Sequence, residues 1–371
     1  MTLYPNLILD ALKSVRYPGN GKSLADNNMI EDDIRIDGNK VSFSLIFDKP
    51  TDPFIRSVVR AAEAAIASGI SPDVDATINV KTRVAAPQQK PAVLPGVKNI
   101  VGVSSGKGGV GKSTVAANLA VALAAKGYKV GLLDADIFGP SMPKMFGVED
   151  EQLYMVHKED RDWIEPIEKY GVKMLSIGFL VDKEKPVLWR GGMASNALKQ
   201  LITDAWWGDL DYFLIDMPPG TSDIHLTLVQ TLPITGVVVV STPQEVALAD
   251  ARKGIAMFTG DAVNVPILGL VENMAWFTPE KHPDERYYIF GEGGAVKLAE
   301  QQGVKLLAQI PLVMDIRAHA DDGAPVATEL ESNPDTANAE AKAFGTLADN
   351  VITAVQERNS TLPPTTKVET H

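Results

Sequence analysis

Short apolar runs alternate with helical stretches over most of the chain, from about residue 98 onward. These runs cover residues 99–104, 129–133, 172–177, 212–215, 236–241, 267–272 and 306–310. Near-continuous apolar strands separated by helices are typical of a parallel sheet with helices on both faces. We therefore predict an α/β domain with a mostly parallel, doubly wound sheet over residues 98–358, and we expect its ligand at the carboxyl ends of the strands.

The first part of the chain has a different pattern and no catalytic signature. Its expected elements are helices at 7–15 and 53–67 and strands at 40–47 and 75–82. This pattern predicts a small α+β domain over residues 1–85. The proline-containing segment 86–97 is typical of an extended linker, and the polar residues 359–371 predict a disordered tail.

The composition and net charge of the chain exclude several classes of protein. The chain has 371 residues, 45% of them hydrophobic, and a formal net charge of −12. No apolar run approaches the length of a membrane span, and the N-terminus lacks the apolar core of a signal peptide, so we expect a cytoplasmic protein. The acidic balance argues against nucleic acid or an anionic membrane as a partner. Cysteine is absent, which removes disulfides, thiolate nucleophiles and thiolate metal ligands.

The most informative motif lies between the first apolar run of the larger domain and an alanine-rich helical stretch. Residues 105–114 read Ser-Gly-Lys-Gly-Gly-Val-Gly-Lys-Ser-Thr and satisfy the phosphate-loop pattern G-x-x-x-x-G-K-[ST]. Glycines allow backbone N–H groups to face phosphate oxygens, Lys112 neutralises the β and γ phosphates, and the Ser113 hydroxyl ligates Mg²⁺. The residues predicted to bind ATP are Gly106, Gly108, Gly109, Val110, Gly111, Lys112, Ser113 and Thr114.

A dinucleotide site is the competing interpretation of the same loop. Residues 106–111 also fit G-x-G-x-x-G, and Asp134 follows about 20 residues later, as in dinucleotide-binding folds. Residues 112–114, Lys-Ser-Thr, favour the triphosphate, because a dinucleotide site does not need a lysine and a metal-binding hydroxyl there.

Carboxylates follow two other strands. Asp216 ends the apolar run Tyr-Phe-Leu-Ile, the Walker B arrangement, and is predicted to hold Mg²⁺ with Ser113. Asp134 and Asp136 lie at the end of another strand, where one can orient the attacking water and the other can support the metal shell. Residues 217–223 form a glycine-hinged loop suited to sensing the γ-phosphate.

Lys107, with the following Gly-Gly-Val, resembles the deviant phosphate loop of the ATPase class that contains MinD, ParA, nitrogenase iron protein and ArsA. The resemblance implies that Lys107 reaches the nucleotide of a partner subunit across a dimer interface. It also implies that Asp136 is the acidic residue involved in hydrolysis, and that Asn273 and the loop after Pro311 contact adenine.

A narrower resemblance covers the C-terminal two-thirds of the chain, which is similar to the Mrp/ApbC-type iron-sulfur cluster carrier ATPases. The matching segments are 105–114, 134–141, 189–191, 207–212, 216–223, 272–274 and 289–294. The resemblance implies a homodimeric ATPase that holds a bridging cluster and assembles or transfers iron-sulfur clusters to apoproteins, together with other cluster-assembly proteins. The N-terminal unit looks like the small domain that this family often carries.

The chain departs from this family at the cluster ligands. The family has a C-x-x-C pair in the loop after Glu-Asn-Met, but residues 275–288 contain no cysteine, and neither does the small domain at 48–54. A four-cysteine bridging cluster therefore cannot form from this chain alone. Glu280, His282 and Asp284 could instead form a metal site of other chemistry; a solvated polar loop is the alternative.

Other functions stay open at this point. An ATP-dimerised positioning switch, like MinD or ParA, would call for a basic amphipathic helix, and residues 341–356 lack clustered Lys and Arg. A cluster-free, nucleotide-switched accessory chaperone is a further alternative. Arg190 could contact a phosphate or a client, Trp189, Trp206 and Trp207 are expected in the core or a dimer interface, and His225 and His319 are expected to be partly buried at the surface.

Overall fold

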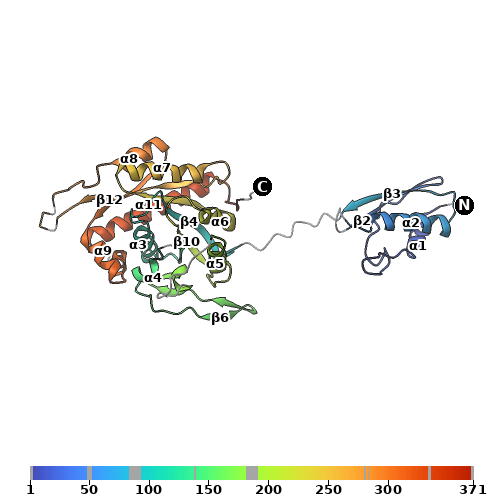
Figure 1. Ribbon diagram of the computed structural model, residues 1–371, viewed down its shortest axis with the longest axis horizontal. Helices are drawn as coiled ribbons and strands as arrows, with labels where there is room; N and C mark the ends of the chain where they lie inside the picture. The colour runs from blue at the N-terminus through green and yellow to red at the C-terminus, as the bar shows by residue number, and fades with distance from the viewer. Residues whose placement is uncertain are drawn as a thin grey trace. The chain divides into compact units, whose positions relative to one another are not determined.

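The structure is a computed structural model that describes residues 3–47, 52–82, 93–137, 139–180, 191–279, 281–282, 284–332 and 336–368. The chain divides into two compact units, residues 1–90 and 91–371 (Figure 1). Each unit has its own hydrophobic core. Across the described part of the chain, no helix combines the length and the apolar character needed to cross a membrane.

The smaller unit is a three-stranded sheet with two helices. Its elements are α1 (Pro5–Leu12), β1 (Arg35–Asp37), β2 (Lys40–Phe47), α2 (Ile55–Gly69) and β3 (Asp75–Thr82). Strand β2 is antiparallel to β1 and parallel to β3. Three residues of α2 spaced four apart, Val58, Ala62 and Ile66, are buried in the core, as expected for one face of a helix. The predicted small α+β unit is therefore confirmed, with β1 as an unpredicted edge strand.

The larger unit is built on one eight-stranded sheet in the order β13-β12-β11-β4-β10-β5-β9-β8. Its strands are β4 (Val97–Ser105), β5 (Val130–Asp134), β8 (Ile167–Lys169), β9 (Val172–Ser176), β10 (Leu210–Asp216), β11 (Gly236–Ser241), β12 (Ile267–Phe277) and β13 (Leu306–Leu312). All neighbouring strands are parallel except the edge pair β8 and β9. Each apolar run predicted as a strand lies in this sheet, so the α/β prediction is confirmed.

Helices cover both faces of the sheet (Figure 1). The bounds of the helices are α3 (Lys112–Ala125), α4 (Met142–Met145), α5 (Gly191–Thr203), α6 (Asp223–Thr231), α7 (Glu245–Thr259), α8 (Gly294–Gln302), α9 (Met314–Asp321), α10 (Glu329–Ser332) and α11 (Ala339–Thr361). Helices α3 and α11 share one core with Leu132 and Leu214, whereas α5 to α8 share the other with Leu133 and Phe213. Consecutive strand residues thus face opposite layers, which explains why the strands are apolar throughout.

Two local features differ from the predictions. A two-stranded hairpin, β6 (Met155–Lys158) with β7 (Arg161–Ile164), was not predicted. The prediction of a disordered tail from residue 359 is wrong for residues 359–368. Helix α11 continues to Thr361, the Thr365 hydroxyl donates to the Pro233 carbonyl at 3.0 Å, and Val368 N donates to Val229 O at 3.1 Å. A polar composition gives no indication of these few contacts, which hold the segment against the domain. The predicted linker 86–97 lies outside the described residues as far as residue 92, and β4 begins at Val97.

Candidate nucleotide-binding site

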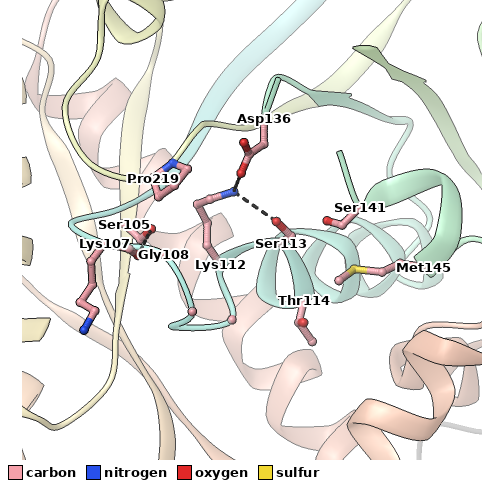
Figure 2. Close-up of a pocket in the computed structure, with 12 residues that line it drawn as sticks. Ser105, Lys107, Gly108, Lys112, Ser113, Thr114, Asp136, Ser141, Met145 and Pro219 are labelled. Atoms are coloured by element: carbon pink, nitrogen blue, oxygen red, sulfur yellow. Dashed lines mark hydrogen bonds and ion pairs between the residues drawn. The ribbon is translucent and has the colours of Figure 1, made fainter. Parts of the chain in front are cut away.

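The phosphate loop joins the central strand β4 to the first turn of α3 at the carboxyl edge of the sheet (Figure 2). Gly109 and Gly111 adopt left-handed φ values of 83° and 80°, which glycine adopts without steric cost. A Cβ atom at Gly111 would lie 2.2 Å from Asn273 Nδ2, and one at Gly106 would lie 2.1 Å from the Asp250 carbonyl carbon in α7. The glycines are therefore required both by backbone conformation and by close packing around the loop.

The loop borders a cavity of about 230 Å³. Besides the loop and the start of α3, its walls include Asp136, Ser141, Met145 and Pro219, and Figure 2 shows these side chains around Lys112 and Ser113. The helix N-terminus and the loop amides provide positive potential here. A cavity of this composition suits a phosphate chain.

The predicted charged residues meet in this cavity. Lys112 Nζ lies 2.5 Å from Asp216 Oδ1 and 3.9 Å from Asp136 Oδ2. The Ser113 hydroxyl donates to Asp216 Oδ2 at 2.6 Å and lies 3.2 Å from Lys112 Nζ. Lys112 is only 6% exposed and Asp216 is fully buried. The structure thus brings Lys112, Ser113, Asp136 and Asp216 together from three different strand ends.

Asp134 lies behind this group and organises the following loop. Its carboxylate accepts hydrogen bonds from the Ser176 hydroxyl at 2.9 Å and from the amides of Met142 and Asp136 at 3.2 Å. Asp134 is paired with Asp216 across β5 and β10. Burial, and then the negative charge of Asp216, raise the pKa of Asp134 to about 7. These contacts assign Asp134 to the support of the site and leave Asp136 at the cavity wall.

Burial also raises the pKa of Asp216, although Lys112 opposes the shift. Two oxygen donors, the Ser113 hydroxyl and the Asp216 carboxylate, lie side by side here. Oxygen ligands of this kind are what Mg²⁺ prefers beside phosphates. The residues present therefore fit the metal that triphosphate chemistry needs.

Lys107 and Asn273 have different surroundings at the phosphate loop. The Lys107 side chain points away from Lys112 and Asp136 (Figure 2), and among the described residues its ammonium forms no ion pair. Asn273, at 6% exposure on β12, donates from Nδ2 to the Val110 carbonyl at 2.8 Å. The Asn273 amide thus holds the phosphate loop, and a contact with adenine stays a prediction.

Ser141 is a site residue that sequence reasoning did not single out. Its hydroxyl is buried, finds no hydrogen-bond partner within the described residues, and lines the cavity. Figure 2 shows it directed toward Ser113. Ser141 precedes α4 but does not cap it; the first amide of α4 is bound by Asp134 instead. The signal in the sequence is the Gly-Pro-Ser at 139–141, which belongs to the family-matching segment 134–141.

The loop 217–223 ends in a capping box at the start of α6. Ser222 and His225 exchange hydrogen bonds, and the Ser222 amide donates to His225 Nδ1 at 3.1 Å. His225 packs against Phe258 and is fully buried, so the expectation of a surface histidine is wrong. Burial lowers its pKa, and the charge of Lys112 acts in the same direction.

Residues 275–288, where the family's cysteine pair is expected, are held together by backbone hydrogen bonds and a cation–π contact. Phe277 and Tyr287 exchange backbone hydrogen bonds of 2.9 and 2.8 Å, and the Arg286 guanidinium lies 4.2 Å from the Trp276 ring centroid. His282 Nδ1 lies 3.5 Å from Glu285 Oε1. No group of three His, Asp or Glu side chains suited to a metal occurs in the described parts of the chain; Glu280 lies outside them, as do Trp189 and Arg190.

The two remaining tryptophans occupy different environments. Trp207 is buried against Phe213, with ring centroids 4.6 Å apart, and belongs to the core. Trp206 packs edge-on against Trp163 of β7, at 5.6 Å. The packing of these two tryptophans explains their positions, and neither lines the nucleotide cavity.

Comparison with protein families gives two matches that together cover most of the chain. Residues 96–352 match a ParA family model described as NUBPL iron-transfer P-loop NTPase. Residues 6–80 match a model described as iron-sulfur cluster assembly protein.

Individual relatives agree with these family matches. An iron-sulfur cluster carrier protein from Synechocystis is 44% identical over 345 residues, which cover 91% of this chain and 95% of the relative. The iron-sulfur cluster carrier protein of Escherichia coli is 48% identical over 272 residues, covering 73% of this chain and 70% of the relative. A solved nucleotide-binding protein from Archaeoglobus fulgidus in complex with ADP is 40% identical, with a TM-score of 0.54 over 62% of this chain and 88% of that chain.

Proposed function

The chain belongs to the NUBPL iron-transfer P-loop NTPase family, and from this membership and the cavity geometry we propose that it binds and hydrolyses ATP to support the loading or transfer of iron-sulfur clusters to apoproteins. The observation that carries the nucleotide part is the meeting of Lys112, Ser113, Asp136 and Asp216 at one cavity. The cluster part is supported by relatives named as iron-sulfur cluster carrier proteins.

Each residue has a distinct role in this proposal. The loop amides and Lys112 bind the phosphates, while Ser113 and Asp216 would hold Mg²⁺, which would supply neutralisation of the phosphate charge. Asp136 faces the same cavity without a hydrogen bond to Lys112, at 3.9 Å, and so has a carboxylate oxygen available to orient the attacking water.

We propose that Lys107 acts on the nucleotide of a second copy of the chain. The direction of its side chain, away from its own Lys112 and Asp136 (Figure 2), supports this role. Lys107→Ala should bind ATP normally but lose ATP-dependent dimerisation, measured by light scattering, and should lose most of its turnover. Arg252→Ala, an exposed change in α7, is the control. Unchanged dimerisation and turnover in Lys107→Ala would contradict the role.

The donor set does not fit a thiolate-ligated cluster, because the chain contains no cysteine. We therefore propose that the cluster is cargo whose ligands come from the client, a cluster-assembly protein or a small thiol. The nucleotide state of this chain then governs the association with those partners.

Anaerobic reconstitution with iron and sulfide tests this proposal. We expect the purified chain alone to bind no stoichiometric cluster while it hydrolyses ATP, and we expect transfer from a cluster-loaded scaffold to an apo-ferredoxin to be faster with the chain and Mg-ATP. Lys112→Ala, which should bind ATP more weakly and lose turnover, serves as the matched control. If wild type and Lys112→Ala give the same transfer rate, the proposed role in cluster delivery is wrong. If the chain alone binds a stoichiometric cluster, the proposal that the cluster ligands come from other molecules is wrong.

A further inference from the structure

A second cavity lies at the opposite edge of the same sheet. It has a volume of about 320 Å³ and is bordered by Val97 and Ile100 at the start of β4, Pro233 before β11, and Arg358 and Leu362 around the end of α11. Strand β4 runs from this cavity to the phosphate loop, and nine residues of strand span about 30 Å. The cavity is therefore separate from the nucleotide site, and the described residues that line it belong to the larger unit.

The chemistry of this cavity is set by one guanidinium. Arg358 Nε is buried and has no hydrogen-bond partner among the described residues, and the terminal Nη1 reaches only Asn359 Oδ1 at 3.2 Å. Lys98 at the rim is already paired with Asp211 at 2.8 Å. None of the ion pairs formed within the described residues involves Arg358, and none of the described residues that line the cavity carries a carboxylate. Burial lowers the pKa of Arg358, as expected where no nearby negative charge compensates the guanidinium.

The remaining wall is mostly apolar. Besides Arg358, the cavity is lined by the apolar residues Val97, Ile100, Pro233, Leu362 and Pro364. Small-molecule sites of about this volume typically combine apolar walls with a few polar groups that fix orientation. A ligand suited to this one would carry a single anionic group on a compact apolar body.

We propose that this cavity binds a small amphipathic monocarboxylate, whose carboxylate pairs with the Arg358 guanidinium and whose apolar part packs against Ile100, Pro233 and Leu362. A guanidinium matches the geometry of a carboxylate with two parallel hydrogen bonds.

The ligand would also bridge parts of the domain that are far apart in sequence. Asn359 Nδ2 donates to Asn99 Oδ1 at 2.9 Å, and Asn99 Nδ2 donates to Asp211 O at 3.0 Å, which links α11 to β4 and β10. The hydroxyl of Thr365 holds the C-terminal wall to Pro233. Occupancy should therefore stabilise the domain against unfolding, since the ligand binds only the folded arrangement.

Calorimetric titration of the full chain with octanoate tests the proposal, with octan-1-ol and octylamine as probes that share the apolar body but lack the negative charge. We expect octanoate to bind with one-to-one stoichiometry, to bind at least tenfold more tightly than either control, and to raise the unfolding temperature. Saturating Mg-ADP should not compete. Competition by Mg-ADP, or no octanoate binding at millimolar concentration, would overturn the site.

Variants locate the interaction. Arg358→Gln should weaken octanoate binding about tenfold or more, whereas Arg358→Lys, which keeps the charge, should weaken it less. Arg317→Gln, on the exposed face of α9 and outside the cavity, should leave octanoate binding unchanged. If Arg358→Gln does not fold, Leu362→Asp places a negative charge at the mouth and should exclude octanoate instead. Octanoate affinity equal to that of wild type in Arg358→Gln, or in Leu362→Asp, would contradict the proposal.

Discussion

The Lys112 ammonium lies 2.5 Å from Asp216 Oδ1, and this pair joins the phosphate loop to the end of β10 in a nearly solvent-free environment. A buried ion pair makes a small net contribution to stability, but removal of one partner leaves an uncompensated charge. The same two residues therefore serve both the predicted chemistry and the integrity of the loop.

The first prediction separates these two effects. Lys112→Ala should weaken ATP binding about 10- to 100-fold, because a charged hydrogen-bond donor to the phosphates is lost, and should abolish measurable turnover. It should also lower the free energy of unfolding by about 3 kcal/mol, because Asp216 is left buried without a partner. The double variant Lys112→Ala with Asp216→Asn should regain most of this stability without regaining turnover. Urea denaturation and phosphate release measure the two quantities; a double variant as unstable as the single one would show that the charge is not the cause.

The second prediction concerns hydrolysis alone. Asp136→Asn should bind ATP nearly as well as wild type but should lower kcat by about 10² to 10³, because a positioned base contributes about that much. Single-turnover kinetics and equilibrium binding of a fluorescent ATP analogue distinguish the two steps. Glu245→Gln, at the exposed start of α7, is the control with a carboxylate outside the cavity. Normal single-turnover rates in Asp136→Asn would rule out the assignment.

The strands and the phosphate loop were predictable because their signals are local. The apolar runs identify strands within a few residues, and residues 105–114 determine the turn and the chemistry without reference to the rest of the chain. The convergence of Asp216 with Ser113 was predictable as well, because the carboxyl ends of parallel strands meet at one edge.

Other features depend on contacts between distant residues. Asp134 supports the site, and Asp136 lines the cavity, because Asp134 accepts hydrogen bonds from Ser176 on another strand and from the amide of Met142. The burial of His225 depends on Phe258 of α7. Such contacts follow from how helices pack on the sheet, and a single sequence has no periodic signal for them.

The third prediction tests the residue that the structure added to the site. Ser141→Ala should weaken binding of ATP about three- to tenfold, the effect of one lost hydrogen bond, because its hydroxyl faces Ser113 within the cavity. Its thermal stability should be unchanged or slightly higher, because the hydroxyl is buried without a partner among the described residues. Ser141→Thr should retain binding. Equal ATP affinity in wild type and Ser141→Ala would show that the hydroxyl contributes nothing to the nucleotide site.

The fourth prediction follows from the buried imidazole at the end of the loop 217–223. Burial lowers the pKa of His225 below its ordinary value of 6.5. The unfolded chain therefore takes up this proton more readily than the folded chain, and the contribution of His225 to stability is lost as the pH falls through that range. The His225→Gln variant keeps the geometry of a capping box, because glutamine is a usual residue at that position, but does not titrate there. The difference between the melting temperatures of wild type and His225→Gln should shift in favour of the variant between pH 8 and pH 5.5. Parallel pH profiles for wild type and His225→Gln would mean that the buried imidazole does not set the acid sensitivity of the domain.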